Sequence, residues 1–156
     1  MSPLGRKVFL AMIPLNLVLV VWVWIGRIVF GAGGWFFLIL LISVVPVVLV
    51  ALLITTILSF RGSDAPHALN PSQALAQLVV WGGMLAFGFF LVDFGDTSDS
   101  ELSAFTQVVG RNDNTLALSW TLTSASAIVT VVAWMALLVM LLAQRRRHRS
   151  GAPVPA

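Results

Sequence analysis

The feature that most constrains this chain is a long uncharged apolar stretch that a basic run follows directly. Residues 117–143 contain no charged side chain. The run that follows consists of Gln144, Arg145, Arg146, Arg147, His148 and Arg149. At 1.5 Å per residue, a helix of this length would measure roughly 40 Å, more than the hydrocarbon core of a bilayer, which is about 30 Å thick. The stretch therefore predicts a membrane-spanning helix whose basic end stays in the cytoplasm.

The composition extends this prediction to the whole chain. Hydrophobic residues make up 59% of the 156 residues, charged residues make up 10%, and the mean hydropathy is +1.00. These values are typical of a polytopic membrane protein. The excess of basic residues lies at the chain ends and in loops, so it indicates topology and not nucleic-acid binding. Because the chain has no cysteine, disulfides and thiolate metal sites are excluded.

Three further apolar segments are long enough to cross a membrane. We expect four spans, at about 8–29, 35–60, 72–92 and 116–143. Together they form a four-helix transmembrane domain over residues 8–143. A short cytoplasmic N-terminus, 1–7, precedes this domain, and a basic cytoplasmic tail, 144–156, with a disordered end follows it. The predicted fold class is an all-α bundle of four transmembrane helices.

The distribution of Lys and Arg predicts the orientation of these spans. Two basic residues, Arg27 and Arg111, fall on the outer side. Seven fall on the inner side, namely Arg6, Lys7, Arg61, Arg145, Arg146, Arg147 and Arg149. This asymmetry predicts a multi-pass protein of the plasma membrane with both termini in the cytoplasm. The inner basic residues would contact anionic lipid headgroups.

Local signals predict where the second span bends and where the third begins. The second span is longer than the bilayer needs, so it should tilt, or bend at Pro46, which has no backbone N–H. Ser43 can satisfy the carbonyl groups that such a bend frees. Asn70 suits the N-cap of the third span, with Pro71 at the first helical position. Gln73 can reach back to the cap as in a capping box.

The outer loop, 93–114, is expected to contain a short amphipathic helix near 99–109. Ser98 and Glu101 have the spacing of a capping box at its start. Apolar residues then recur at helical spacing, at Leu102, Phe105, Val108 and Val109. Such a helix would lie on the outer membrane surface. Asp113 or Asn114 should cap the fourth span.

Two groups of small or hydroxyl residues predict close helix packing. In the third span Gly82 and Ala86 have the spacing that lets helix backbones approach, and Gly83 lies beside them. In the fourth span one helical face carries Ser119, Thr123, Ser126 and Thr130. We interpret this hydroxyl stripe as packing, because no ionisable group accompanies it. The alternative is a polar path for a solute, which Asn16 and Gln77 would help to line.

The acidic residues of the outer loop offer two interpretations. Asp93, Asp96, Asp99 and Glu101 supply carboxylate oxygens that a hard cation prefers, but their spacing does not match a calcium loop. We therefore expect a solvated acidic loop and treat a metal site as the weaker alternative. Arg27 ends the first span on the side where Asp93 follows the third, which predicts an ion pair of Arg27 with Asp93 or Asp96, partly screened by solvent.

The chain lacks the signatures of the common catalytic and cofactor sites. His67 and His148 fall in a loop and a tail, whereas haem ligands would need to lie at membrane depth. No nucleophile elbow, zinc-binding helix motif or phosphate loop is present. The interiors of the four spans carry no Asp, Glu, Lys, Arg or His, and intramembrane chemistry depends on such residues. We therefore expect no enzyme activity and no cofactor.

Two segments carry a resemblance to known sequences. IPLNLVLVVWVWIGRIVFGAGGWF (13–36) and GFFLVDFGDTSDS (88–100) resemble segments of small four-span integral membrane proteins of GC-rich Gram-positive bacteria. The resemblance implies a four-span fold and no assigned activity. Small multidrug exporters share this size, but they use a Glu in the first span where this chain has only Asn16.

The sequence thus leaves two classes of function open. The favoured hypothesis is a non-enzymatic accessory or scaffold subunit that packs against other membrane protein subunits or against itself. The alternative is a small transporter or pore, including a phage-type lysis pore, that uses the polar face of the fourth span. A dry, closed bundle would favour the first, and a continuous wet cavity bordered by Asn16, Gln77 and Ser126 would favour the second.

Overall fold

The computed structural model describes residues 3–62, 68–94 and 101–149. Its helical elements are α1 (Pro3–Ile25), the 3-10 helix η1 (Gly26–Phe30), α2 (Phe36–Ile42), α3 (Val44–Gly62), α4 (Pro71–Phe90), α5 (Ala104–Val109) and α6 (Asp113–Arg149). The only β-type pairing among the described residues is an isolated bridge between Asp93 and Leu102. The fold is therefore all-α, as predicted.

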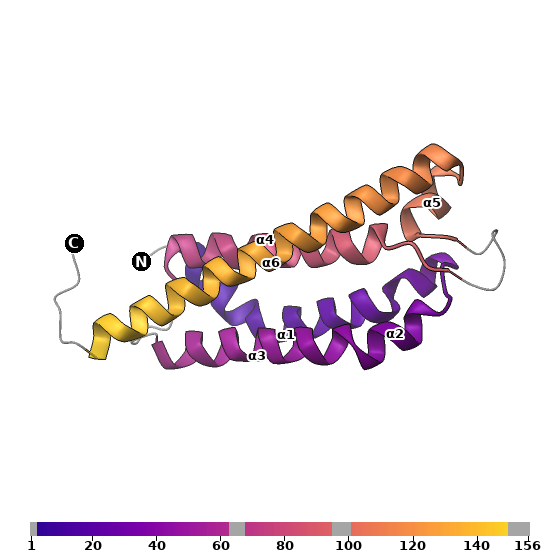
Figure 1. The fold of residues 1–156 in the computed structure, drawn as a ribbon. Helices are drawn as coiled ribbons and strands as arrows, with labels where there is room; N and C mark the ends of the chain where they lie inside the picture. The colour runs from indigo at the N-terminus through magenta and orange to yellow at the C-terminus, as the bar shows by residue number, and fades with distance from the viewer. Residues whose placement is uncertain (1–2, 63–67, 95–100, 150–156) are drawn as a thin grey trace.

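The four long helices run back and forth along one axis (Figure 1). Helix α4 packs against α6 and α1, and α3 closes the arrangement by contacting both α1 and α6. The start of α1, the end of α3, the start of α4 and the end of α6 share one end of the bundle, which we call the basic end. The opposite end, which holds η1, α2 and α5, is called the loop end.

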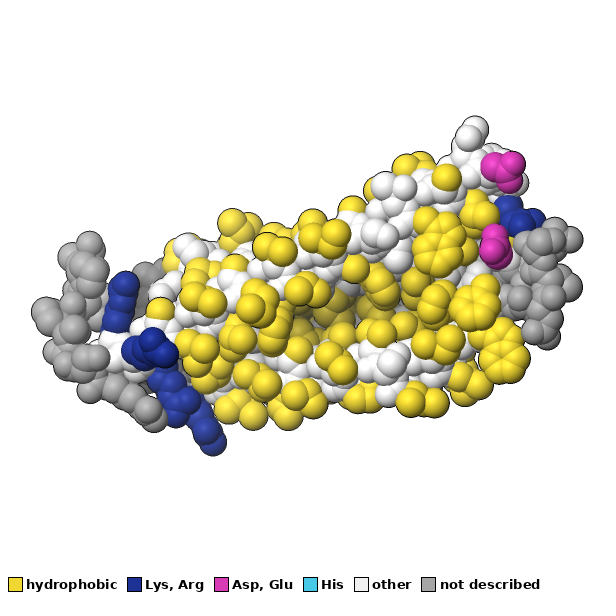
Figure 2. Space-filling view, viewed as in Figure 1, with side chains coloured by type: hydrophobic (Ala, Val, Ile, Leu, Met, Phe, Trp, Pro, Cys, Tyr) yellow, Lys and Arg dark blue, Asp and Glu magenta, His cyan; other side chains and the backbone are white. Residues whose placement is uncertain are grey.

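Among the described residues, four segments are long and apolar enough to cross a membrane. They are Pro3–Phe30, Val44–Arg61, Pro71–Phe90 and Asp113–Arg147. Figure 2 shows hydrophobic side chains over the middle of the molecule, a group of basic side chains at one end, and acidic side chains with a basic side chain between them near the other end. Because apolar side chains cover the outside as well as the core, the fold is that of a polytopic membrane protein.

The core lies where α1, α4 and α6 face one another. Met12, Val80 and Leu137 are each buried to 1% exposure or less. Aromatic and aliphatic side chains of α1 and α4 extend this cluster toward both ends. These contacts fix how each helix is rotated about its axis, which decides the polar residues that can meet.

The second span is broken into α2 and α3. The break lies at Ser43, three residues before Pro46, and not at the proline itself. A proline ring clashes with the carbonyl group four residues earlier, which here belongs to Ile42. The Ser43 hydroxyl donates to the Ile39 carbonyl oxygen at 2.5 Å, which also accepts from the Ser43 N–H at 3.0 Å, so Ser43 closes the last turn of α2.

Two helices extend beyond the spans that the sequence suggested. Helix α1 begins at Pro3, so Arg6 and Lys7 lie on its first turns and not in a separate polar segment. Helix α6 does not end at 143, because it continues through the basic run to Arg149. A run of arginines does not break a helix, since Arg is a good helix former and favours the negative C-terminal end of the helix dipole.

The start of α4 confirms the predicted capping box. The caps of α5 and α6 are residues other than those predicted. The Gln73 side chain accepts from the Asn70 N–H at 3.0 Å. Asn112, and not Asp113 or Asn114, caps α6, because its side-chain oxygen accepts from the Thr115 N–H at 2.9 Å.

Helix α5 is shorter than the expected loop helix and begins at Ala104. Its cap is Ser103, whose hydroxyl accepts from the Thr106 N–H at 3.1 Å. Leu102 lies outside the helix because it pairs with Asp93. The Ser98 that was expected to cap lies outside the described residues.

Candidate functional site

A polar cluster joins three helices inside the bundle. The Asn16 amide oxygen of α1 accepts from the Trp81 indole N–H at 2.7 Å and from the Gln77 amide at 3.3 Å, both on α4. The Asn16 amide nitrogen donates to the Thr56 hydroxyl of α3 at 3.2 Å. Asn16 is 5% exposed and Gln77 is 0% exposed. Asn16 is thus the hub of a buried cluster, which we call the Asn16 cluster.

The hydroxyl stripe of α6 is turned toward its own backbone. Thr123, Ser126 and Thr130 each donate to a carbonyl oxygen of α6, at 2.7 to 2.9 Å. These bonds leave no hydroxyl hydrogen on these three residues for a passing solute. The small side chains instead let α4 approach closely, as the packing interpretation expects.

Gly83 marks the close approach between α4 and α6. A Cβ atom added there would overlap the Thr130 hydroxyl and lie 3.4 Å from the Ser126 carbonyl oxygen. A Cβ atom added at the adjacent Gly82 would have nothing within 4 Å. The contact therefore depends on Gly83, whereas the sequence motif pointed to Gly82 and Ala86.

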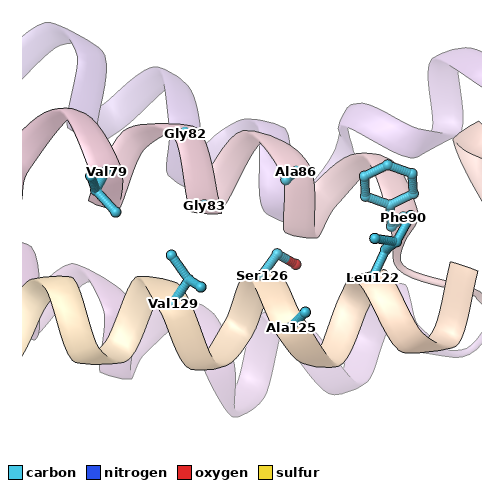
Figure 3. Close-up of a pocket in the computed structure, with 9 residues that line it drawn as sticks. All are labelled: Val79, Gly82, Gly83, Ala86, Phe90, Leu122, Ala125, Ser126 and Val129. Atoms are coloured by element: carbon cyan, nitrogen blue, oxygen red, sulfur yellow. The ribbon is translucent and has the colours of Figure 1, made fainter.

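Gly82 and Ala86 instead line an apolar groove on the outside of the bundle. The groove has a volume of about 390 Å³. It is lined by Val79, Gly82, Gly83, Ala86 and Phe90 of α4 and by Leu122, Ala125, Ser126 and Val129 of α6 (Figure 3). Neither Asn16 nor Gln77 belongs to this lining, so this groove does not bring together the two sets of residues that a polar path would need.

Ser119 has a role different from that of the other stripe residues. Its hydroxyl lies 2.6 Å from the Phe90 carbonyl oxygen at the end of α4 and 2.8 Å from the Ser103 hydroxyl before α5. Ser119 and Ser103 are both fully buried. Phe105 of α5 packs beside Phe90 with ring centroids 5.2 Å apart. Ser119 thus ties α6 to α4 and α5 at the loop end.

Arg27 and Asp93 form a buried ion pair at the loop end. Arg27 Nη2 lies 3.0 Å from Asp93 Oδ2, and each side chain is 1% exposed. The contact is an ion pair and not a hydrogen bond, because no guanidinium nitrogen has a partner of hydrogen-bonding geometry among the described residues. The guanidinium carbon also lies 5.8 Å from the Phe36 ring centroid. The expectation that solvent screens this pair is wrong.

The Asp93 carboxylate also holds the turn that precedes α2. It accepts from the Gly34 N–H at 2.8 Å, and from the Phe36 and Phe94 N–H groups at 2.9 Å each. A Cβ atom at Gly34 would overlap the Phe94 carbonyl oxygen, so only glycine fits. A carboxylate beside the N–H groups at a helix start is also favoured by the helix dipole.

Of the acidic residues that the metal hypothesis names, Asp93 and Glu101 lie within the described ranges. Asp96 and Asp99 lie outside the described residues. Asp93 is engaged by Arg27 and by backbone N–H groups, and Glu101 is half-buried. Within the described ranges, no group of three or more His, Cys, Asp or Glu side chains could hold a metal ion.

The basic residues predicted for the inner side lie at the basic end of the bundle. Arg6, Lys7, Arg61, Arg146 and Arg147 are exposed, and Arg145 is half-buried. Arg149 closes α6, but its side chain is outside the described part. Next to this group, the Gln73 amide donates to the Gln144 side chain at 2.7 Å and joins α4 to α6.

Several connecting residues carried no signal in the sequence. Indole N–H groups donate to backbone carbonyl oxygens of other helices, from Trp22 to Leu85 at 3.0 Å and from Trp134 to Ala51 at 3.1 Å. Trp81 and Thr56 in the Asn16 cluster were also missed. A tryptophan in an apolar run looks like any other apolar residue, and only the three-dimensional arrangement reveals its partner.

The chemistry of these sites is that of structural connection. The Asn16 cluster consists of amides, a hydroxyl and an indole, which exchange hydrogen bonds but do not titrate near neutral pH. The ion pair at the loop end is covered by the protein. Comparison with family models, with curated proteins and with solved structures finds no match for this chain.

Proposed function

We propose that this protein is a non-enzymatic accessory or scaffold subunit of a plasma-membrane complex, with both termini in the cytoplasm. In this proposal the groove between α4 and α6 receives a transmembrane helix of a partner subunit. The observation that carries the proposal is the small-residue floor of that groove, formed by Gly82, Ala86 and Ala125.

The position and lining of the groove support this role. Gly82 lies near the middle of α4, and Ala125 lies within the apolar part of α6, so the groove faces the hydrocarbon core of a membrane. Lipid is as apolar as a helix, so helices in membranes associate through close packing at small residues. The one polar lining residue, Ser126, already donates to the Thr123 carbonyl oxygen. A partner would therefore bind through shape and van der Waals contact.

The alternative of a transporter or pore receives less support. It requires Asn16, Gln77 and Ser126 to border one path. Ser126 lines the apolar groove, whereas Asn16 and Gln77 bond to each other and to neighbouring helices. An enzyme is a third choice, since the chain offers no reactive constellation that would support one.

The test is to enlarge one lining side chain and to follow what copurifies. Ala125→Leu fills the groove, and Ala136→Leu makes the same change at an exposed position of α6 outside the lining. Each variant is expressed at native level, extracted in mild detergent and examined by quantitative mass spectrometry. We expect the wild type and Ala136→Leu to carry the same membrane protein in fixed stoichiometry, and Ala125→Leu to lose it. Retention by Ala125→Leu, or absence of any partner from the wild type, contradicts the proposal.

A further inference from the structure

The Asn16 cluster contains a hydrogen-bond acceptor that has no donor. Gln77 Oε1 is fully buried and has no hydrogen-bond partner among the described residues. A buried amide oxygen without a donor destabilises the folded state, because it has given up its hydrogen bonds to water and gained none in return. Inside a membrane no bulk water is available to relieve that cost. The orphaned oxygen therefore needs a physical explanation.

Reversal of the amide groups does not remove the problem, because Trp81 fixes their orientation. The indole N–H can only donate, so the Asn16 atom that lies 2.7 Å from it must be the oxygen. The Asn16 amide nitrogen then faces the Thr56 hydroxyl, to which it donates. The orientation of Asn16 thus follows from the chemistry of its neighbour.

The same reasoning fixes Gln77. One of its amide atoms lies 3.3 Å from the Asn16 oxygen, and that atom must be the nitrogen, since two oxygens would repel. Oε1 must then point away from Asn16. The unpaired acceptor is therefore imposed by the arrangement of Trp81, Asn16 and Gln77.

The cluster also contains N–H and O–H hydrogens that make no hydrogen bond among the described residues. The Thr56 hydroxyl oxygen accepts from Asn16, and the hydroxyl hydrogen of Thr56 has no acceptor among the described residues. Each amide NH₂ group of Asn16 and Gln77 has two hydrogens, of which the cluster uses one. A ligand for this place must donate to one oxygen and accept from N–H or O–H groups. A metal cation would find only one free oxygen ligand, Gln77 Oε1. An anion would be repelled by the partial negative charge of that oxygen.

We propose that the Asn16 cluster is the binding site of one internal water molecule, held between α1, α3 and α4. The water donates to Gln77 Oε1 and accepts from two of the spare amide and hydroxyl hydrogens. Buried waters in proteins typically make about three such bonds to groups that would otherwise be unpaired. This water completes the polar contacts that hold α1, α3 and α4 together, independently of what binds outside.

Water-selective NMR of the full chain in lipid nanodiscs tests this site directly. In the ¹⁵N-labelled wild type, the side-chain amides of Asn16 and Gln77 should show cross-relaxation with water, with the sign of a long-lived bound molecule. Gln77→Leu removes the acceptor and should abolish the Asn16 signal. Gln73→Leu is the matched control one turn earlier in α4, where the amide is already paired with Gln144, and the Asn16 signal should persist.

Two results would overturn the proposal. One is a folded wild type whose assigned Asn16 and Gln77 amides show no cross-relaxation with water. The other is an Asn16 signal that persists unchanged in Gln77→Leu. If Gln77→Leu does not fold, Gln77→Met takes its place, because it removes the acceptor with less change of shape, and the wild-type measurement stands alone in either case.

Discussion

Arg27 Nη2 lies 3.0 Å from Asp93 Oδ2 at the loop end of the bundle, and both side chains are 1% exposed. The pair connects η1 to the segment that leaves α4, and Asp93 also holds the turn before α2. Because the pair is buried, losing one partner should affect stability more than it would for an exposed pair. An exposed pair contributes little, whereas removing one partner of a buried pair leaves a charge that neither water nor protein compensates.

The two members of this pair should respond unequally to substitution. Asp93→Asn leaves the Arg27 charge buried without a counter-charge and should lower the free energy of unfolding by about 3–5 kcal/mol. Arg27→Met should cost less, because Asp93 keeps three backbone N–H donors. Thermal unfolding in detergent, followed by circular dichroism, measures both. Asp113→Asn, at an exposed carboxylate, is the control and should change little. A larger loss for Arg27→Met would contradict this account.

Adjacent glycines of α4 should respond to alanine in opposite directions. Gly83→Ala forces a methyl group onto Thr130 and should destabilise the protein by about 1–3 kcal/mol. Gly82→Ala meets nothing within 4 Å and should stabilise by about 0.5–1 kcal/mol, because alanine is the better helix former. The measurement is the midpoint of thermal unfolding of each variant. Equal effects of the two substitutions would show that α4 is rotated differently about its axis.

Substitution of Asn16 should lower the free energy of unfolding more than substitution of one of its hydrogen-bond partners. Asn16→Leu removes three hydrogen bonds and leaves the Trp81 indole unpaired, so we expect a loss of about 1–2 kcal/mol. Thr56→Val removes one bond at nearly constant shape and should cost only part of that. Denaturant titration of both variants gives the comparison. The hub assignment fails if Thr56→Val is as damaging as Asn16→Leu.

The proposed orientation can be tested with single cysteines, because the chain has none of its own. Asn114→Cys, at the exposed start of α6, should react with a membrane-impermeant maleimide in intact cells. Ser2→Cys and Gly151→Cys should react only after permeabilisation, since the basic residues beside them favour the cytoplasm. Labelling of Gly151→Cys in intact cells would overturn the proposed topology.

The architecture of this protein could be predicted from the sequence because it depends on local properties. The apolar length of a segment, the lack of charge and the cost of unpaired backbone in lipid are enough to identify four helices. The cap at Asn70 followed from residue types and spacing alone. The position of the break in the second span was off by three residues, because the strain from Pro46 acts one turn earlier, at Ile42.

The partners of individual side chains were decided only by the tertiary structure. Gly82 and Gly83 are adjacent and chemically identical, yet a Cβ atom added at Gly82 would meet nothing within 4 Å, whereas one added at Gly83 would overlap the Thr130 hydroxyl. An ion pair of Arg27 with Asp93 or Asp96 followed from their places at neighbouring helix ends, but the choice of Asp93 and the burial of the pair did not. In each case the outcome depends on how a helix is rotated about its axis and how deeply its end is covered. Those quantities come from the packing of all the helices together, and no single stretch of sequence contains them.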